Sequence, residues 1–296
     1  MSIATILLPD FALILIGFAL FRYTDWGPAF WTGLEKLIYF ILFPALLFYS
    51  TSRAPLDFDS TSKLIPVAVL AVLSGIALGW LARPLFRVGP MIFESGVQTA
   101  FRFNSYISLA VASRLGGDEG TALMGLIIGF AVPLCNFAAV HALAHRSGGL
   151  LREVVRNPLL LATAGGLLFN VSGLQLPEVG HLVLVRLGNA SIALGLIAVG
   201  AGLRLAGHSE ARGIGTYFLA VKLLAVPAIT YAAASWIGLP ALQMQIVVMF
   251  AALPTASSAY VLAVRMGGNG PLVAFLISAS TVLSLFTLPF WLSLVL

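Results

Sequence analysis

The chain has 296 residues, of which 60% are hydrophobic and only 9% are charged, and its formal net charge is +5. A soluble core of this size does not need so much apolar surface, so the composition is typical of a protein whose solvent is lipid. We attribute the basic balance to membrane topology and anionic headgroups, and we expect no nucleic acid partner.

Ten apolar segments follow one another along the chain, each with about the twenty residues that cross a bilayer. We expect them near residues 3–21, 34–52, 64–82, 92–114, 121–143, 157–173, 183–203, 214–236, 242–264 and 270–294. The first segment has no basic region before it, so we interpret it as a span and not as a cleaved signal. The short connectors leave no room for a soluble domain. The sequence thus predicts an all-α membrane protein with ten transmembrane helices.

The basic residues of the connectors indicate the orientation. Connectors after odd-numbered segments hold nine arginines, whereas the connectors on the opposite side hold four basic residues. The positive-inside rule therefore places the odd connectors in the cytoplasm and both termini outside. We expect a multi-pass protein of the bacterial cytoplasmic (inner) membrane.

The second half of the chain repeats features of the first. The run Arg114–Asp118 (RLGGD) returns 151 residues later as Arg265–Asn269 (RMGGN), and each run ends a corresponding apolar segment, the fourth and the ninth. Because five segments are an odd number, the second unit must cross the membrane in the opposite sense. We expect residues 1–145 to form the first five-helix repeat, 146–156 a short cytoplasmic connector, and 157–296 the inverted second repeat. Carriers use such repeats to reach one midplane site from both sides.

Polar residues gather at matching depths in the fourth and ninth segments. The candidates for substrate binding there are Arg102, Asn104, Ser105, Pro254, Thr255 and Ser257. A proline removes one backbone hydrogen bond of a helix, and the freed backbone groups cannot face lipid. A half-helix that begins at such a break points its positive end toward the midplane, where it favours anions. We predict that helices four and nine are broken and cross at a binding site; the alternative is a proline kink packed by Ser and Thr.

Three ionisable side chains of the apolar segments, Arg102, Lys222 and Asp10, are candidates for function. A central arginine costs about 2.5–3.5 kcal/mol on insertion scales, so we expect Arg102 to bind an anionic group or maintain a gate. Its alternatives are snorkelling or capping the carbonyls of a broken helix. Lys222 and Asp10 are candidates for coupling or gating. The alternatives are snorkelling of Lys222 and solvation of Asp10 at the outer interface.

Two further polar residues complete the set of binding candidates. Asn136 lies in the fifth segment, where its amide reaches substrate or holds a neighbouring helix. Ser50 stands at a repeat-related position in the second segment, where packing is the alternative role. The sequence contains no hydrolase, P-loop or dinucleotide motif, so we expect no enzyme activity and no cofactor. The four histidines form no clear metal set, and we expect no metal site.

Several motifs resemble those of the auxin efflux carrier family, whose bacterial members include malate or malonate permeases. The similar segments are Arg102–Ile107, Val132–Asn136, Arg156–Leu159, Leu187–Ser191, Gly200–Leu203 and Leu253–Ala256. Together they cover nearly the whole chain, and each alone is moderately specific. The resemblance implies two inverted five-helix repeats, similar to bile acid sodium symporters, with the fourth and ninth helices broken and crossing at the substrate site. It implies that Asn104 and Pro254 mark the crossover and that Asn136 lines it.

The chain departs from the family pattern in two places. Many relatives have a proline shortly after the fourth-segment asparagine, where this chain has Leu109 and Ala110. The first break would then depend on polar side chains. The long hydrophilic loop of plant auxin exporters is missing between the halves, which makes auxin a poor substrate candidate.

The sequence therefore predicts a secondary carrier that moves a small organic anion, a carboxylate, by alternating access, with efflux as the preferred direction. The alternative within transport is proton- or sodium-coupled uptake by the same fold. A membrane sensor or scaffold is the alternative from another class, but the short connectors offer no output domain. The expected partners are the anion and membrane lipid, with the choice between monomer and homodimer left open.

Overall fold

The computed structural model describes residues 3–53, 58–143, 158–203, 211–256 and 258–296, and all regular secondary structure in these residues is helical. The predicted connector at 146–156 lies outside these residues. Within the described residues, six helical stretches are long and apolar enough to cross a membrane: Pro28–Arg53, Ser62–Leu85, Pro90–Leu143, Glu178–Ala201, Arg212–Ile237 and Gly270–Ser293. Two shorter apolar helices, Phe11–Tyr23 and Ala241–Ala252, accompany them.

The chain divides into two compact units, each assembled from separate stretches of sequence. The first comprises Met1–Thr61, Tyr106–Gly129 and Leu151–Gly202; the second comprises Ser62–Ser105, Phe130–Leu150 and Leu203–Leu296. Each unit therefore combines segments from the early and the late part of the chain. The long helix α6 (Ser105–Leu143) contributes to both, and its backbone leaves helical geometry at Gly116 and Gly117.

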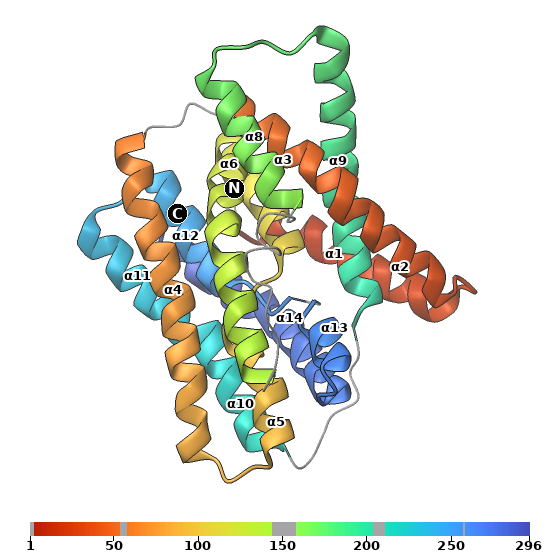
Figure 1. Ribbon diagram of the computed structural model, residues 1–296, viewed down its shortest axis with the longest axis vertical. Helices are drawn as coiled ribbons and strands as arrows, with labels where there is room; N and C mark the ends of the chain where they lie inside the picture. The colour runs from red at the N-terminus through yellow and green to blue at the C-terminus, as the bar shows by residue number, and fades with distance from the viewer. Residues whose placement is uncertain (1–2, 54–57, 144–157, 204–210, 257) are drawn as a thin grey trace. The chain divides into compact units, whose positions relative to one another are not determined.

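Helix pairs from opposite ends of the sequence build the first unit. Helix α1 (Ile3–Tyr23) packs along α9 (Glu178–Ala201), and α3 (Phe43–Arg53) packs along both α8 (Pro158–Val171) and α9. Figure 1 shows the green α8 lying against the orange α3. Helix α2 (Pro28–Leu37) joins α3 through a π-helical turn, Ile38–Leu42.

Glycines permit the closest of these approaches. A Cβ atom added to Gly17 would lie 2.0 Å from the carbonyl oxygen of Ile197, and one added to Gly200 would lie 1.8 Å from that of Ile14. A Cβ added to Gly166 would lie 2.7 Å from the carbonyl oxygen of Phe48. Because lipid gives helices no hydrophobic reason to associate, such close backbone contact is a principal source of packing energy.

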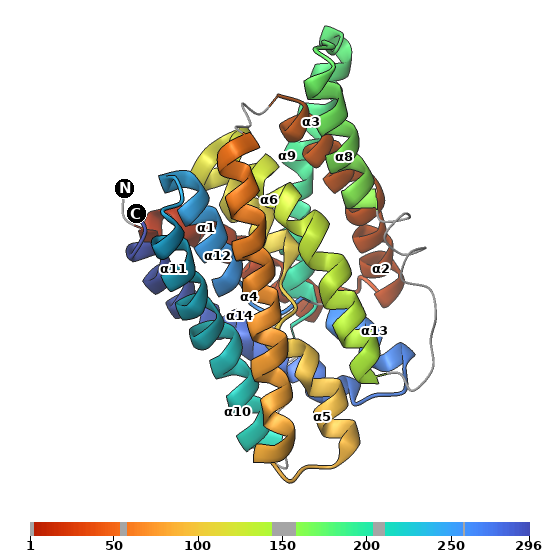
Figure 2. The ribbon, with the colours of Figure 1, turned by 60° about the vertical axis from the view of Figure 1, so that its left-hand side comes forward.

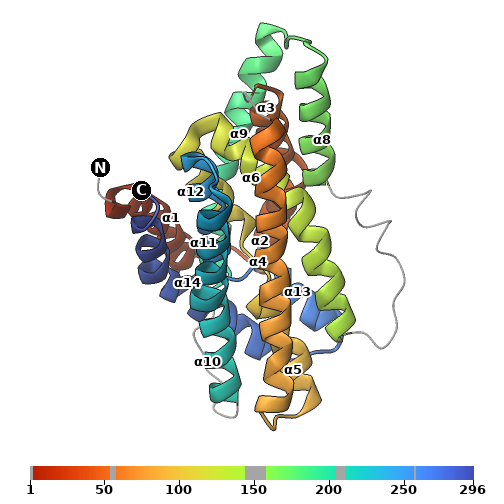
Figure 3. The same ribbon diagram turned by 90° about the vertical axis from the view of Figure 1, so that its left-hand side faces the viewer.

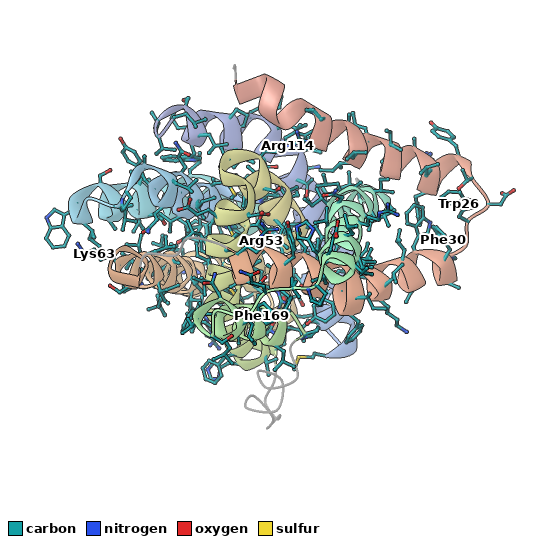
Figure 4. The ribbon with its side chains drawn as sticks, turned by 90° about the horizontal axis from the view of Figure 1, so that it is seen from above. Trp26, Phe30, Arg53, Lys63, Arg114 and Phe169 are labelled. Carbon is teal, nitrogen blue, oxygen red and sulfur yellow. The ribbon has the colours of Figure 1, made fainter. Side chains whose placement is uncertain are left out.

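Aromatic side chains gather where α1 turns into α2. Trp26 and Phe30, labelled in Figure 4, have ring centroids 4.8 Å apart, and Trp31 lies 5.2 Å from Phe30. Trp26 and Phe30 are half exposed, whereas Trp31 is buried. Tryptophan is enriched where a helix end meets the membrane–water interface, so this cluster is typical of an interfacial anchor.

The remaining helices belong to the second unit. They are α4 (Phe58–Leu85), α5 (Pro90–Gly96), α10 (Arg212–Ala220), α11 (Val226–Ile237), α12 (Ala241–Ala252), α13 (Ser258–Arg265) and α14 (Gly270–Ser293). A π-helical turn, η4 (Val221–Ala225), joins α10 to α11, and the two helices run on as one rod in Figure 3. Figure 2 shows α4 beside α10, and the Tyr217 hydroxyl donates to the Leu78 carbonyl at 2.8 Å there.

Candidate functional site

The chain leaves helical geometry between α5 and α6, within the predicted fourth segment. Helix α5 continues into a 3-10 turn, η2 (Val97–Ala100), and residues 101–104 are not helical. The amides of Phe101 and Arg102 both donate to the Gln98 carbonyl, at 3.4 and 3.0 Å. Gly75 of α4 fits against this point, because an added Cβ would lie 2.9 Å from the Ala100 carbonyl oxygen. The interruption is thus packed by a residue without a side chain and needs no proline of its own.

A second interruption follows α12, within the predicted ninth segment. The helix ends at Ala252, and Leu253 is extended, with φ −60° and ψ 146°. Pro254 explains this ending, because proline disfavours helical geometry in the residue before it and has no amide hydrogen to donate. Helix α13 begins at Ser258.

The two interruptions are hydrogen-bonded to each other inside the second unit. The backbone amide of Asn104 donates to the Pro254 carbonyl at 2.9 Å, and the Thr255 hydroxyl donates to the Thr99 carbonyl at 2.8 Å. Asn104 is 2% exposed and Thr255 is 0% exposed. Backbone groups that leave a buried helix must find other partners, and here each interruption supplies partners for the other.

Arg102 places a full positive charge beside this crossing point. Its side chain is 8% exposed, and Nη2 donates to the Ser258 hydroxyl at 3.0 Å. Ser258 is the first residue of α13, so the arginine connects the first interruption to the helix that follows the second. This degree of burial excludes snorkelling of Arg102 to the membrane surface.

Neighbouring helices satisfy other backbone groups of the interruptions. The Thr255 amide donates to the Ser280 hydroxyl of α14 at 3.1 Å. The Phe101 carbonyl accepts from the Cys135 thiol of α6 at 3.5 Å. Lys222 is 2% exposed and donates through Nζ to the Ala251 carbonyl at 2.8 Å. Snorkelling, the alternative role considered for Lys222, is therefore wrong, because its ammonium group is bound in the interior.

The structure brings together some of the sequence-predicted residues and not others. Arg102, Asn104, Pro254 and Thr255 meet at the crossing, with Ser105 at the start of α6. Asn136 lies on the part of α6 that belongs to the second unit and is partly buried. Ser257 lies outside the described residues. Asp10 and Ser50 lie in α1 and α3 of the first unit, and their side chains are also outside the description.

Sequence reasoning missed Ser280 and the Ala251 carbonyl as parts of the site. The run of serine and threonine at Ser278, Ser280, Thr281 and Ser284 in the tenth segment was the available signal for Ser280. A backbone carbonyl has no signal in the sequence.

The arrangement combines buried positive charge with polar backbone at a helix discontinuity. The helix starts at Ser105 and Ser258 present the positive ends of two helix dipoles, and Arg102 adds a guanidinium that can hold a carboxylate through two hydrogen bonds. Within the residues that the structure describes, no group of three or more His, Cys, Asp or Glu side chains could hold a metal ion. These groups are suited to binding an anion.

The chain is similar to known transporters in sequence. The family model described as membrane transport protein matches residues 143–292. A protein of Methanothermobacter thermautotrophicus named "Uncharacterized transporter" is 29% identical over 288 residues, which cover 94% of each chain. A protein of Rhizobium meliloti named "Putative malonate transporter" is 25% identical over 284 residues, which cover 90% of this chain and 87% of the relative.

Proposed function

Because this chain belongs to the membrane transport protein family, we propose that it is a secondary carrier for a small organic anion. The family and both relatives are transporters, so the chain is a multi-pass membrane transporter and not an enzyme. The proposed substrate is a carboxylate, and the proposed mode is efflux across a bacterial cytoplasmic membrane by alternating access.

One observation carries this proposal: two interrupted helices are hydrogen-bonded to each other beside a buried arginine. Asn104 and Pro254 join the interruptions at 2.9 Å, and Arg102 lies two residues from Asn104. In the proposed site, Arg102 supplies the charge and the backbone around Asn104 and Thr255 orients the carboxylate. Ser105 completes the binding surface together with Asn136 and Ser257.

The helix pairing supports the proposed ten-helix inverted repeat, with halves 1–145 and 157–296. In such a repeat, α1 corresponds to α8, and α3 corresponds to α9. The pairs α1·α9 and α3·α8 are then related by the pseudo-twofold axis, and both are closely packed. With the 151-residue offset, Asn104 of the first repeat corresponds to Thr255 of the second, and both residues form hydrogen bonds between the two interruptions.

The same repeat accounts for the 54-residue stretch Pro90–Leu143. Its backbone departs from helical geometry at 101–104 and again at Gly116–Gly117. A turn at the glycines would give two crossings of the membrane in place of one, as ten spans require. In this topology the odd-numbered connectors face the cytoplasm and both termini lie outside.

Efflux of an anion has a ready driving force. A potential that is negative inside contributes about 2.3 kcal/mol per charge per 100 mV toward export. In alternating access a substrate site opens first to one side of the membrane and then to the other, largely through rigid-body movement of one helix bundle against another. The division of the chain into two compact units is compatible with such a mechanism.

A thermal-shift screen tests the substrate class. Purified protein in detergent is heated with a panel of mono- and dicarboxylates, including malonate, and with the uncharged diamide malonamide as a matched control for shape. We expect at least one carboxylate, at a hundredfold excess over its dissociation constant, to raise the Tm by about 3 °C or more, and malonamide to leave it unchanged. Equal shifts from malonate and malonamide, or no shift from any carboxylate, would contradict the proposal.

A further inference from the structure

Lys222 binds a backbone carbonyl that is released by the interruption after α12. In a continuous helix the Ala251 carbonyl would accept from the amide of residue 255, four positions later. The Thr255 amide donates instead to the Ser280 hydroxyl at 3.1 Å. The Ala251 carbonyl accepts from Lys222 Nζ at 2.8 Å in its place. The ammonium group therefore replaces a lost helical hydrogen bond at the end of a half-helix.

This position is electrostatically suited to a cation. The last turn of a helix carries the negative end of its dipole, and Ala251 is the penultimate residue of α12. Lys222 is 2% exposed. Among the described residues, no Asp or Glu forms an ion pair with it. The buried charge is thus balanced by backbone dipoles and not by a carboxylate, although removing an ammonium from water is costly.

The π-helical turn fixes where this ammonium lies. Lys222 is the second residue of η4, Val221–Ala225. A π-turn releases carbonyl groups from the regular pattern, and the Leu223 carbonyl accepts from the Trp291 indole of α14 at 2.9 Å. Such turns are inserted into helices frequently at functional sites. The bond from Lys222 to α12 and the bond from Trp291 of α14 hold the π-turn in place within the second unit. The ammonium group therefore has a defined position.

Many secondary carriers bind their coupling cation at this kind of position, through unwound carbonyls and the C-terminal ends of half-helices. We propose that the Lys222 ammonium is a tethered cation that takes the place of a soluble coupling ion, so carboxylate binding by this protein requires no sodium. The proposal rests on the proposed function for its substrate. It also argues against sodium-coupled uptake, one form of the alternative left open by the sequence, because a sodium-coupled symporter needs this place for sodium.

Removing the tether should turn the position into a site for soluble cations. In the Lys222→Ala protein, the missing side chain leaves room for ethylammonium beside the Ala251 carbonyl. Lys222→Met removes the charge but keeps most of the volume, so it should not accept ethylammonium. Lys63→Ala is the matched control, because Lys63 is an exposed lysine of the same unit; Figure 4 labels it on α4.

The first measurement needs no substrate. The Tm of each full-length variant is recorded in detergent with chloride salts of choline, sodium, lithium and ethylammonium. We expect ethylammonium, compared with choline, to raise the Tm of Lys222→Ala by about 3 °C or more when it is saturating. The wild type, Lys222→Met and Lys63→Ala should show no such difference. If Lys222→Ala responds to ethylammonium no more than Lys222→Met does, the position does not bind a cation and the proposal is overturned.

The second measurement uses the carboxylate that gives the largest thermal shift. In choline medium we expect Lys222→Ala and Lys222→Met to bind it about tenfold more weakly or worse, with recovery by ethylammonium only in Lys222→Ala. Wild-type binding that is lost without sodium, or Lys222→Met binding equal to wild type, would overturn the proposal. If no carboxylate binds to the wild type, the proposed function fails, but the first measurement still decides whether Lys222 occupies a cation site.

Discussion

Replacing Arg102 by Gln is expected to weaken carboxylate binding about 30-fold to several thousand-fold, which corresponds to a loss of about 2–5 kcal/mol for truncating one partner of a buried charge pair. Arg102 is 8% exposed, so water screens its charge poorly. Glutamine removes the charge and keeps the first methylene groups and a polar end, although its amide is too short to replace the contact of Nη2 with the Ser258 hydroxyl at 3.0 Å. The variant therefore tests the charge more than the packing. Binding is measured by isothermal titration on the detergent-purified protein.

Two matched variants separate the charge of Arg102 from other effects. Arg102→Lys keeps the charge but cannot form the paired hydrogen bonds of a guanidinium, so its affinity should lie between those of wild type and Arg102→Gln. Arg212→Gln removes an exposed arginine at the start of α10 in the same unit and should leave affinity unchanged. Equal losses in Arg102→Gln and Arg212→Gln would show a general charge effect and would contradict a direct role for Arg102.

Replacing Gly200 by Ala is expected to destabilise the first unit by about 3 kcal/mol, at the upper end of the usual cost of overpacking. The new methyl group would lie 1.8 Å from the Ile14 carbonyl oxygen, and the nearest atoms are backbone of α1 that cannot rotate away. Helices α1 and α9 would have to separate. The measurement is the Tm of the detergent-purified variant, together with its resistance to proteolysis.

Gly33→Ala is the matched control for this substitution. Gly33 is an exposed residue of α2, and an added Cβ would have no atom within 4 Å. Alanine is the better helix former, so the control should be neutral or stabilised by about 0.5–1 kcal/mol. If Gly200→Ala has the same Tm as Gly33→Ala, the backbones of α1 and α9 do not lie in contact at Gly200.

The sequence predicted the interruptions well, because their causes are side chains. Pro254 cannot donate a backbone hydrogen bond, and the polar run around Asn104 is unfavourable in lipid without protein partners. The structure places non-helical backbone at both points. The family resemblance is confirmed by the family match over residues 143–292, which includes the motif around Pro254. The inverted topology and the roles of the site residues remain predictions.

The partners of the site residues could not be predicted in the same way. Lys222 was considered for snorkelling because its distance along the segment suggested a place near the surface. Its actual partner is the Ala251 carbonyl, 29 positions away in sequence. The Thr255 hydroxyl donates to the Thr99 carbonyl, and the Thr255 backbone amide donates to the Ser280 hydroxyl and not to a carbonyl of α12. Such bonds join side chains to backbone groups that every residue has, so no sequence pattern marks them.

Counterflow of labelled carboxylate into proteoliposomes tests most directly whether the hydrogen-bonded interruptions form a transport site. Liposomes preloaded with the carboxylate identified by thermal shift should accumulate label when they contain the wild-type protein. With Asn104→Ala, reconstituted in equal amount and folded by size-exclusion profile and Tm, accumulation should fall to that of empty liposomes. Accumulation by Asn104→Ala equal to that of wild type would remove the Asn104 side chain from the mechanism, and wild type equal to empty liposomes would contradict carboxylate transport itself.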